Sequence, residues 1–298
     1  MGKASRQKRH GTARERIAAQ QAAQRRVEVR NRVLAVTAVV VVIAVVVVFV
    51  VIKATQKPAA STKASGLPTG AALSKITSQA TSVPPSALDA VGKGNVLQAP
   101  IPLHGQPPLT RNGKPEMVYI GAEFCPYCAT ERWAMAVALS RFGTFSNLNV
   151  THSDVNDQPS NIKTLTFYKS SYSSKYLVFS PVEETDPNKT PLQKPSSDQQ
   201  ALISKYDAPP YVSSQSQGAI PFIDIGGKYI VSGATYSYQL LQGKSWSQIA
   251  AALHDPSSPI AQGALGAANA LTAAICKTTG NQPGNVCNTK AVTSAGQS

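Results

Sequence analysis

Residues 117–128 read MVYIGAEFCPYC, and this stretch decides the expected fold. It opens with a mostly apolar run, which is typical of a central strand buried on both faces of a sheet. Two cysteines follow at once. Residues 129–143 (ATERWAMAVALSRFG) are good helix formers, and they end at Gly143, a residue type that commonly closes a helix. The order of strand, cysteine-containing turn and helix predicts an α/β domain.

The spacing of these two cysteines favours redox chemistry. A thiol attacks a disulfide only as the thiolate, so its pKa must be lowered. We expect Cys125 at the start of the helix, where free N–H groups and the helix dipole stabilise negative charge, and Pro126 suits the first helical position. Cys128 follows one turn later, within disulfide reach. Cys125 is therefore expected to be the exposed attacking sulfur and Cys128 the sheltered resolving one.

Two other interpretations of the motif are weaker. A zinc site would need a second close cysteine pair or histidines, whereas ten residues lie between Cys276 and Cys287 and no histidine clusters with them. We therefore expect no metal, and nothing indicates another cofactor. A purely structural disulfide is common in secreted proteins, but such disulfides seldom close so tight a loop.

The second cysteine pair brackets the turn KTTGNQPGNV after a helical stretch. A disulfide between Cys276 and Cys287 would close a short loop and stabilise the fold by about 3 kcal/mol in the chain-entropy model. We favour a structural disulfide here, with a second redox relay as the alternative.

Residues 33–52 (VLAVTAVVVVIAVVVVFVVI) are twenty residues without a charge. As a helix they would extend roughly 30 Å, the thickness of the hydrocarbon core of a bilayer. A cleaved signal peptide is disfavoured, because 32 residues precede the stretch and no small-residue cleavage site follows it. We expect one transmembrane helix at 33–52.

Charge sets the expected orientation of this helix. Residues 1–32 hold ten Lys or Arg against two Glu, in a chain of net charge +14. The positive-inside bias makes this segment a basic cytoplasmic tail and places the rest of the chain outside a cell membrane that it crosses once. A nucleic-acid-binding tail is the rival interpretation, but a position against an apolar span favours contact with the membrane. We expect no nucleic-acid partner.

The remaining chain divides by composition. Residues 53–68 are rich in Ala, Lys, Ser, Thr and Pro and should form a flexible linker. Residues 69–298 form the expected extracytoplasmic domain, with a second strand near 147–155 and a helical extension at 245–289. Within this domain, AIPFIDI and KYIV flank Gly226-Gly227, a signal for a two-residue hairpin.

Two blocks of this domain resemble the thioredoxin superfamily. Ala122-Glu123-Phe124-Cys125-Pro126-Tyr127-Cys128 looks like its active-site strand and turn. Ala219-Ile220-Pro221-Phe222-Ile223, through Gly227-Lys228 to Ser232-Gly233-Ala234, resembles its second landmark, where a cis-proline precedes a strand and hairpin. The layout is also similar to an uncharacterised family of thioredoxin-like proteins, domain of unknown function 929, found in archaea and actinobacteria.

The resemblance implies an α/β, thioredoxin-like fold and several site residues. The Ile220–Pro221 bond should be cis, with Pro221 against the cysteines and the backbone of Ile220 pairing with a substrate peptide. We also expect Phe124, Pro126 and Tyr127 to contact substrate.

The chain departs from the superfamily pattern in two places. Many thioredoxins have a buried acid six residues before the first cysteine, where this chain has Tyr119. Glu123 is the nearest candidate for the missing proton-transfer role, unless it is a solvated charge at the strand end. The distance in sequence from Cys128 to Pro221 is also long, so residues 159–217 are expected to be an insertion that could shape substrate choice.

These features together predict a membrane-anchored thiol–disulfide oxidoreductase that acts on protein cysteines, recycled by a membrane redox partner or a small thiol. The alternative is a tethered, non-catalytic binding module whose cysteine pair senses redox state. Oxidant, reductant and isomerase share these residues and differ in reduction potential, so the sequence leaves the direction of the reaction open.

Overall fold

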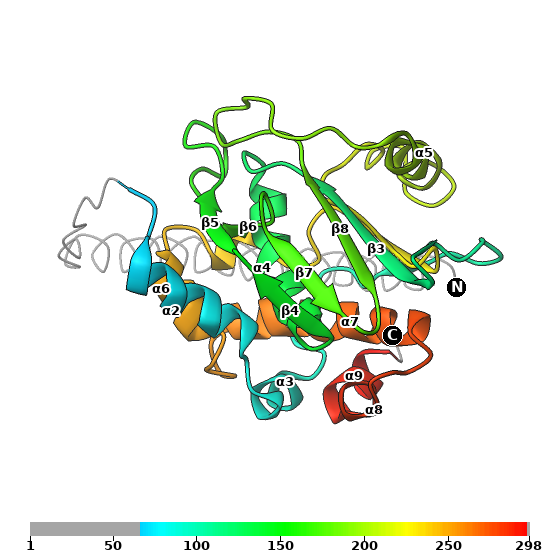
Figure 1. Cartoon of the computed structure of the whole chain (residues 1–298). Coiled ribbons are helices and arrows are strands. Elements are labelled where there is room, and N and C mark those ends of the chain that lie inside the picture. Colours follow the sequence, from blue (N-terminus) through cyan, green and yellow to red (C-terminus); the bar gives the residue numbers. More distant parts are fainter. Residues whose placement is uncertain (1–65, 297–298) are drawn as a thin grey trace, which may run out of the picture. The chain divides into compact units, whose positions relative to one another are not determined.

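Strand β3 (Lys114–Gly121) lies inside the central sheet, where its apolar sequence predicts it. It pairs in parallel with β8 (Val178–Glu183) and antiparallel with β9 (Phe222–Ile225). The structure is a computed structural model and describes residues 66–296 (Figure 1). The basic tail, the expected transmembrane helix and most of the linker lie outside the described residues.

The central sheet is mixed, and its order is β8-β3-β9-β10-β1, with β2 pairing with the first residues of β3. The other members are β10 (Tyr229–Ser232), β1 (Ile101–Pro102) and β2 (Thr110–Arg111). The turn of the β9–β10 hairpin is one residue longer than expected, because the pair of residues next to the turn is Ile225 and Tyr229. Gly226 and Gly227 both have positive φ there, 64° and 67°, as such a turn requires.

Helix α4 follows β3 directly and is the central helix of the domain (Figure 1). It packs against α7 and α2, while α3 and α6 pack on those two helices. The bounds are α4 (Pro126–Ser140), α7 (Pro259–Thr278), α2 (Gly70–Thr81), α3 (Pro85–Val91) and α6 (Trp246–Ala252). Nearly every residue of α4 is buried, which agrees with its apolar composition.

The two faces of β3 contribute to two separate hydrophobic clusters. Met117 and Tyr119 belong to the larger cluster, together with residues of α4 and α7. Val118 and Ile120 point the opposite way and belong to a smaller cluster, which α5 (Ser197–Tyr206) covers. Because both faces are covered, the strand that leads to the cysteines is held from both sides.

The expected end of the helix that follows the cysteines is wrong. Helix α4 ends at Ser140, and Gly143 begins strand β4 (Gly143–Ser146), which pairs with β7 (Ser171–Ser174). A Cβ at Gly143 would lie 2.3 Å from the carbonyl oxygen of Ser173. The glycine therefore serves the close approach of two strands rather than the closure of a helix.

The region between α4 and β9 is more than an insertion. Strand β5 (Asn149–His152) forms at the expected place, but it pairs only with β6 (Lys163–Thr166), outside the central sheet. Strand β8, by contrast, lies inside the range 159–217 and is the parallel neighbour of β3. That part of the range therefore belongs to the central sheet.

The helical extension contains α6, α7 and α8 (Gly284–Cys287), followed by α9 (Lys290–Ala295). Helix α7 is long and apolar enough to cross a membrane by length and composition, but 89% of that stretch is buried inside the domain. Its packing against α4 gives this apolar sequence a structural role, so it is weak support for a membrane span.

Candidate active site

Cys125 is the N-cap residue of α4, as the sequence predicts. Its backbone is extended, and its sulfur accepts a hydrogen bond from the backbone N–H of Cys128 at 3.2 Å. Pro126 occupies the start of the helix, where a missing N–H leaves no hydrogen bond unmade. The local sequence therefore places the first sulfur over the positive end of the helix dipole.

The sulfur of Cys125 is less exposed than expected. Cys125 is 4% exposed and Cys128 is fully buried. The loop before β9 accounts for the difference, because the carbonyl oxygen of Ile220 lies 3.6 Å from the Cys125 sulfur and accepts its hydrogen bond. Cys125 is still the outer of the two thiols, and both are free in the structure.

The two thiols differ in acidity. The pKa of Cys125 is lowered, chiefly because the Cys128 side chain hydrogen-bonds to its sulfur. Burial acts in the opposite direction. The backbone N–H of Cys128 and the positive charge of Arg132 lower the pKa further. Burial raises the pKa of Cys128 well above its ordinary value. Cys125 is thus the thiol that ionises first and can act as the nucleophile.

The loop before β9 has the cis peptide bond that the resemblance implies. The Ile220–Pro221 bond is cis. Pro221 is buried, and its carbonyl oxygen accepts a hydrogen bond from the N–H of Gly233 at 2.9 Å. This bond ties the loop to the end of β10 and holds Ile220 against Cys125.

The residues expected to contact substrate differ in exposure. Tyr127 is 46% exposed, and its ring meets that of Tyr238 edge-on at 5.7 Å. Phe124 is half-buried beneath the ammonium group of Lys189, which lies 5.2 Å from its ring. Pro126 is buried, so the structure gives it a role in starting the helix and no surface for a partner.

Glu123 is not a solvated charge at the strand end. It is 7% exposed, and its two oxygens accept hydrogen bonds from the hydroxyls of Thr151 at 3.0 Å and Thr166 at 2.5 Å. These bonds attach the β5–β6 hairpin to the end of β3. The solvated interpretation is therefore wrong, and both oxygens are occupied.

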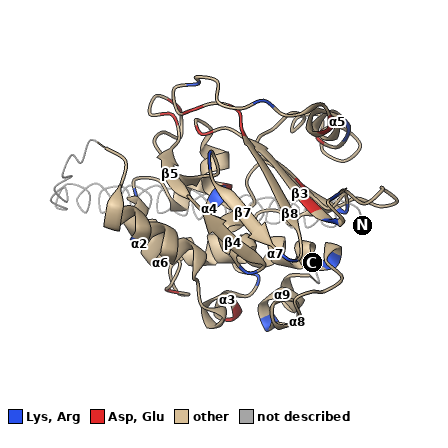
Figure 2. Ribbon diagram, viewed as in Figure 1, with Lys and Arg blue, Asp and Glu red and all other residues tan. Residues whose placement is uncertain are grey.

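A buried ion pair behind the cysteines was missed by sequence reasoning. Arg132 and Glu183 are both fully buried, and the guanidinium group binds the carboxylate through two hydrogen bonds of 2.8 and 2.6 Å. Charged residues otherwise lie mostly in loops and near the ends of elements (Figure 2). Arg132 could have been suspected, because it lies four residues after Cys128 on the same helical face. The sequence around Glu183 did not indicate a role at the site.

A second buried acid on α4 was also missed. Glu131 is fully buried and accepts hydrogen bonds from the N–H of Thr235 at 2.8 Å and from its hydroxyl. Burial raises the pKa of Glu131 to about 7. The contact ties the active-site helix to the turn that follows β10. Within residues 66–296, no group of three His, Cys, Asp or Glu side chains is placed to bind a metal ion.

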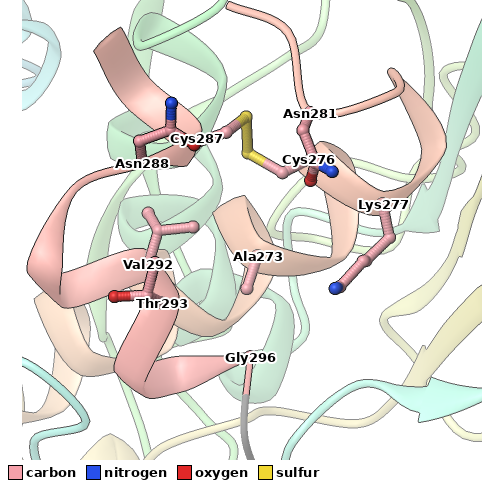
Figure 3. Close-up of a pocket in the computed structure, with 9 residues that line it drawn as sticks. All are labelled: Ala273, Cys276, Lys277, Asn281, Cys287, Asn288, Val292, Thr293 and Gly296. Atoms are coloured by element: carbon pink, nitrogen blue, oxygen red, sulfur yellow. A yellow bond between two sulfur atoms is a disulfide. The ribbon is translucent and has the colours of Figure 1, made fainter. Parts of the chain in front are cut away.

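Cys276 and Cys287 form a disulfide that joins the end of α7 to α8, with their Cα atoms 5.7 Å apart. The disulfide lies in the wall of a pocket of about 320 Å³ (Figure 3). The other lining residues are Ala273, Lys277, Asn281, Asn288, Val292, Thr293 and Gly296. None of these residues belongs to the Cys-Pro-Tyr-Cys motif or to the loop of Ile220, so the pocket is a separate feature.

Fold and site together define an α/β domain with a free cysteine pair at the start of a buried helix. The chain belongs to the family described as a domain of unknown function (DUF929), whose model matches residues 104–277. The match includes both cysteines of the motif and the loop of Ile220. No curated protein and no solved structure matches the chain.

Proposed function

We propose that the protein is a membrane-anchored, extracytoplasmic thiol–disulfide oxidoreductase with a thioredoxin-like domain, acting on the cysteines of other proteins. The observation that carries the proposal is the unlike pair of thiols at the start of α4. Cys125 caps the helix and has a lowered pKa, whereas Cys128 is sealed in the core and has a raised pKa. Only a thiolate attacks a disulfide, so this difference assigns each cysteine a separate role.

The arrangement of strands supports the thioredoxin-like assignment. Strand β3, helix α4 and strand β8 form a unit in which two parallel strands are joined by a segment containing a helix. A Cys-x-x-Cys motif beside such a unit is typical of thioredoxin-like redox proteins. The carbonyl oxygen of Ile220, the residue before the cis-proline, lies 3.6 Å from the sulfur of the first cysteine.

The chemistry follows from these roles. The Cys125 thiolate attacks a substrate disulfide, which forms a mixed disulfide and releases one substrate thiolate. Cys128 then attacks the Cys125 sulfur, which releases the second substrate thiolate and leaves a Cys125–Cys128 disulfide. The substrate gains two electrons and the protein loses two. A small thiol or a membrane redox partner then supplies two electrons that reduce the pair again. Run in reverse, the same steps oxidise a substrate dithiol, and a membrane redox partner accepts the two electrons and re-forms the Cys125–Cys128 disulfide.

The loop of Ile220 supports the proposed binding of a peptide. In the resting structure the carbonyl oxygen of Ile220 accepts a hydrogen bond from the Cys125 thiol. Ionisation of Cys125 removes that donor and leaves the carbonyl free for an N–H of the substrate backbone. Tyr127 offers an exposed ring on the helix that Cys125 caps.

The proposed location rests on the sequence alone. The apolar residues 33–52 would anchor the chain, and the basic residues 1–32 would remain in the cytoplasm. The domain would then work where disulfides persist.

The test is catalysis of insulin reduction by dithiothreitol, and of disulfide formation in reduced ribonuclease, with the full chain in detergent. We expect Cys125→Ser to abolish both activities. Cys128→Ser should retain attack but accumulate a mixed disulfide that can be seen by mass spectrometry. Equal rates for the unaltered chain and Cys125→Ser would contradict the proposal and leave the alternative of a non-catalytic binding module.

A further inference from the structure

In the proposed function, on which this inference rests, the resolving step needs an acceptor for the proton of Cys128. Cys128 is fully buried, so bulk water does not reach its sulfur. Burial raises the pKa of this thiol well above its ordinary value, so the thiol keeps its proton until a base within the protein takes it. The acceptor must therefore be sought among buried groups.

The hydroxyl of Tyr119 borders the same small space as the Cys128 sulfur. Gly121 shows this, because a Cβ at that position would lie 2.2 Å from the Tyr119 hydroxyl oxygen and 3.1 Å from the Cys128 sulfur. Both atoms therefore border the space that a side chain at residue 121 would occupy. Because residue 121 is a glycine, a phenol from β3 and a thiol from α4 can face this space together.

The Tyr119 hydroxyl leads on to a carboxylate. It donates a hydrogen bond to Oε2 of Glu183, on the neighbouring strand β8, at 3.5 Å. This is longer than an ordinary O–H···O bond, as is common for catalytic hydrogen bonds before reaction. Burial raises the pKa of the phenol well above its ordinary value, so Tyr119 can pass a proton on but does not ionise itself.

Glu183 is suited to receive the proton. The paired Arg132 guanidinium holds it by two hydrogen bonds and also binds the carbonyl oxygen of Ala122 at 2.7 Å, which fixes the carboxylate in place. Burial nevertheless raises the pKa of Glu183, which makes it a stronger base than an exposed carboxylate.

The other buried acids near α4 are engaged elsewhere. Glu123, the candidate from the sequence, accepts its hydrogen bonds from the hydroxyls of Thr151 and Thr166, in the β5–β6 hairpin. Glu131 is bound to Thr235, on the turn after β10. Of the three glutamates, Glu183 is the one that a hydrogen bond joins to the phenol beside Cys128.

We propose that Glu183 accepts the Cys128 proton through the hydroxyl of Tyr119 while Cys128 resolves the mixed disulfide. In this step the Cys128 sulfur forms a bond to the Cys125 sulfur, and the bond between Cys125 and the substrate sulfur breaks with its electron pair on the substrate. The thiol proton passes to the Tyr119 oxygen as the phenol proton passes to Glu183. Tyr119 ends unchanged, and Glu183 ends protonated until it exchanges with solvent.

The test separates the two sulfur steps with dithiobis-nitrobenzoate, added in equal amount to the reduced full chain and followed by stopped-flow absorbance. The first thionitrobenzoate is released when Cys125 attacks, and the second when Cys128 resolves the mixed disulfide. Tyr119→Phe removes only the hydroxyl and keeps the ring packed edge-on against Phe167. The matched control is Tyr236→Phe, which removes another buried hydroxyl that binds α4, at the carbonyl oxygen of Thr130.

We expect Tyr119→Phe to leave the first release within about twofold and to slow the second release on the order of 10- to 100-fold at neutral pH. The slowed rate should recover as pH rises, because a higher pH increases the fraction of Cys128 that is already thiolate and needs no relay. A packing defect would slow the step at every pH. The double variant Arg132→Met/Glu183→Leu, which removes the acceptor but keeps the phenol, should slow the second release similarly. Tyr236→Phe should leave both releases unchanged.

Two results would overturn the relay. One is a second release in Tyr119→Phe as fast as in the unaltered chain, and the other is the same pH-independent slowing in Tyr119→Phe and Tyr236→Phe. Either result leaves the proposed function standing, because the first release still occurs. If the unaltered chain released no first thionitrobenzoate, the proposed function would be refuted, and the relay with it.

Discussion

The sulfur of Cys125 lies 3.6 Å from the carbonyl oxygen of Ile220, although 95 positions separate the two residues in the chain. The helix that begins after Cys125 fixes one side of this contact, and the bond from Gly233 to Pro221 fixes the other. The attacking thiol is therefore held between a helix terminus and a loop that offers backbone hydrogen-bonding groups. Its ionisation and its access to reagents both depend on this arrangement.

Alkylation of the reduced chain should reveal the lowered pKa of Cys125. Because the thiolate reacts and the thiol does not, the rate of reaction with iodoacetamide should reach half its maximum below the pH found for free cysteine. Peptide mapping should place the label on Cys125. Cys125→Ser should react slowly until the protein unfolds, since Cys128 is fully buried and burial raises its pKa well above the ordinary value. A midpoint at or above that of free cysteine would contradict the assigned acidity.

The buried ion pair should be sensitive to the loss of one partner. Arg132→Met leaves the carboxylate of Glu183 buried and unpaired, which is expected to cost about 3 to 5 kcal/mol in the free energy of unfolding. The double variant Arg132→Met/Glu183→Leu removes both charges and should recover much of that loss. Urea titrations of the three proteins measure the difference. Equal destabilisation by the single and double variants would show that the charges do not interact as the structure indicates.

Glu131 should make stability depend on pH. Its pKa is about 7 in the folded protein and about 4.5 when unfolded, so folding favours the protonated acid. The stabilisation from protonated Glu131 is complete below the unfolded pKa and is lost as pH rises to the folded pKa, a change of about 3 kcal/mol. Glu131→Gln cannot ionise, and its stability relative to the unaltered chain should rise across this window.

The control for this pH effect is Asp198→Asn, at an exposed acid in the first turn of α5. Its stability relative to the unaltered chain should change by less than about 1 kcal/mol over the same range. If the two variants showed the same pH dependence in thermal unfolding, the burial of Glu131 would not be the cause.

The local part of the site could be predicted from the sequence, because its cause is local. An apolar strand, a cysteine at an N-cap and Pro126 at the start of a helix are set by neighbouring residues. The place of Ile220 in the site was predicted only from the resemblance to the thioredoxin superfamily. No rule of sequence spacing brings the loop before β9 to the start of α4. The burial of Cys125 depends on that loop and was underestimated for the same reason.

Glu183 could not be predicted, because its role depends on the pairing of β8 with β3. Those strands are separated by α4 and by two small sheets, and the partner of a parallel strand cannot be inferred from the strand itself. The misassigned end of α4 has a similar origin. Gly143 looked like a helix-closing residue, whereas a distant strand, β7, requires its small size.

Removal of the second cysteine pair should separate stability from redox activity. The Cys276–Cys287 disulfide closes a short loop between α7 and α8, so Cys276→Ala/Cys287→Ala is expected to lose about 3 kcal/mol in the free energy of unfolding. The pocket beside it shares no residue with the Cys-Pro-Tyr-Cys motif, so the rate of insulin reduction that depends on Cys125 should stay within about twofold below the unfolding temperature. A structural disulfide predicts both results. A second redox relay predicts a different result. Turnover would fall, because electrons could no longer pass between the Cys125/Cys128 pair and the second pair, while the first thionitrobenzoate release from Cys125 would be unaffected.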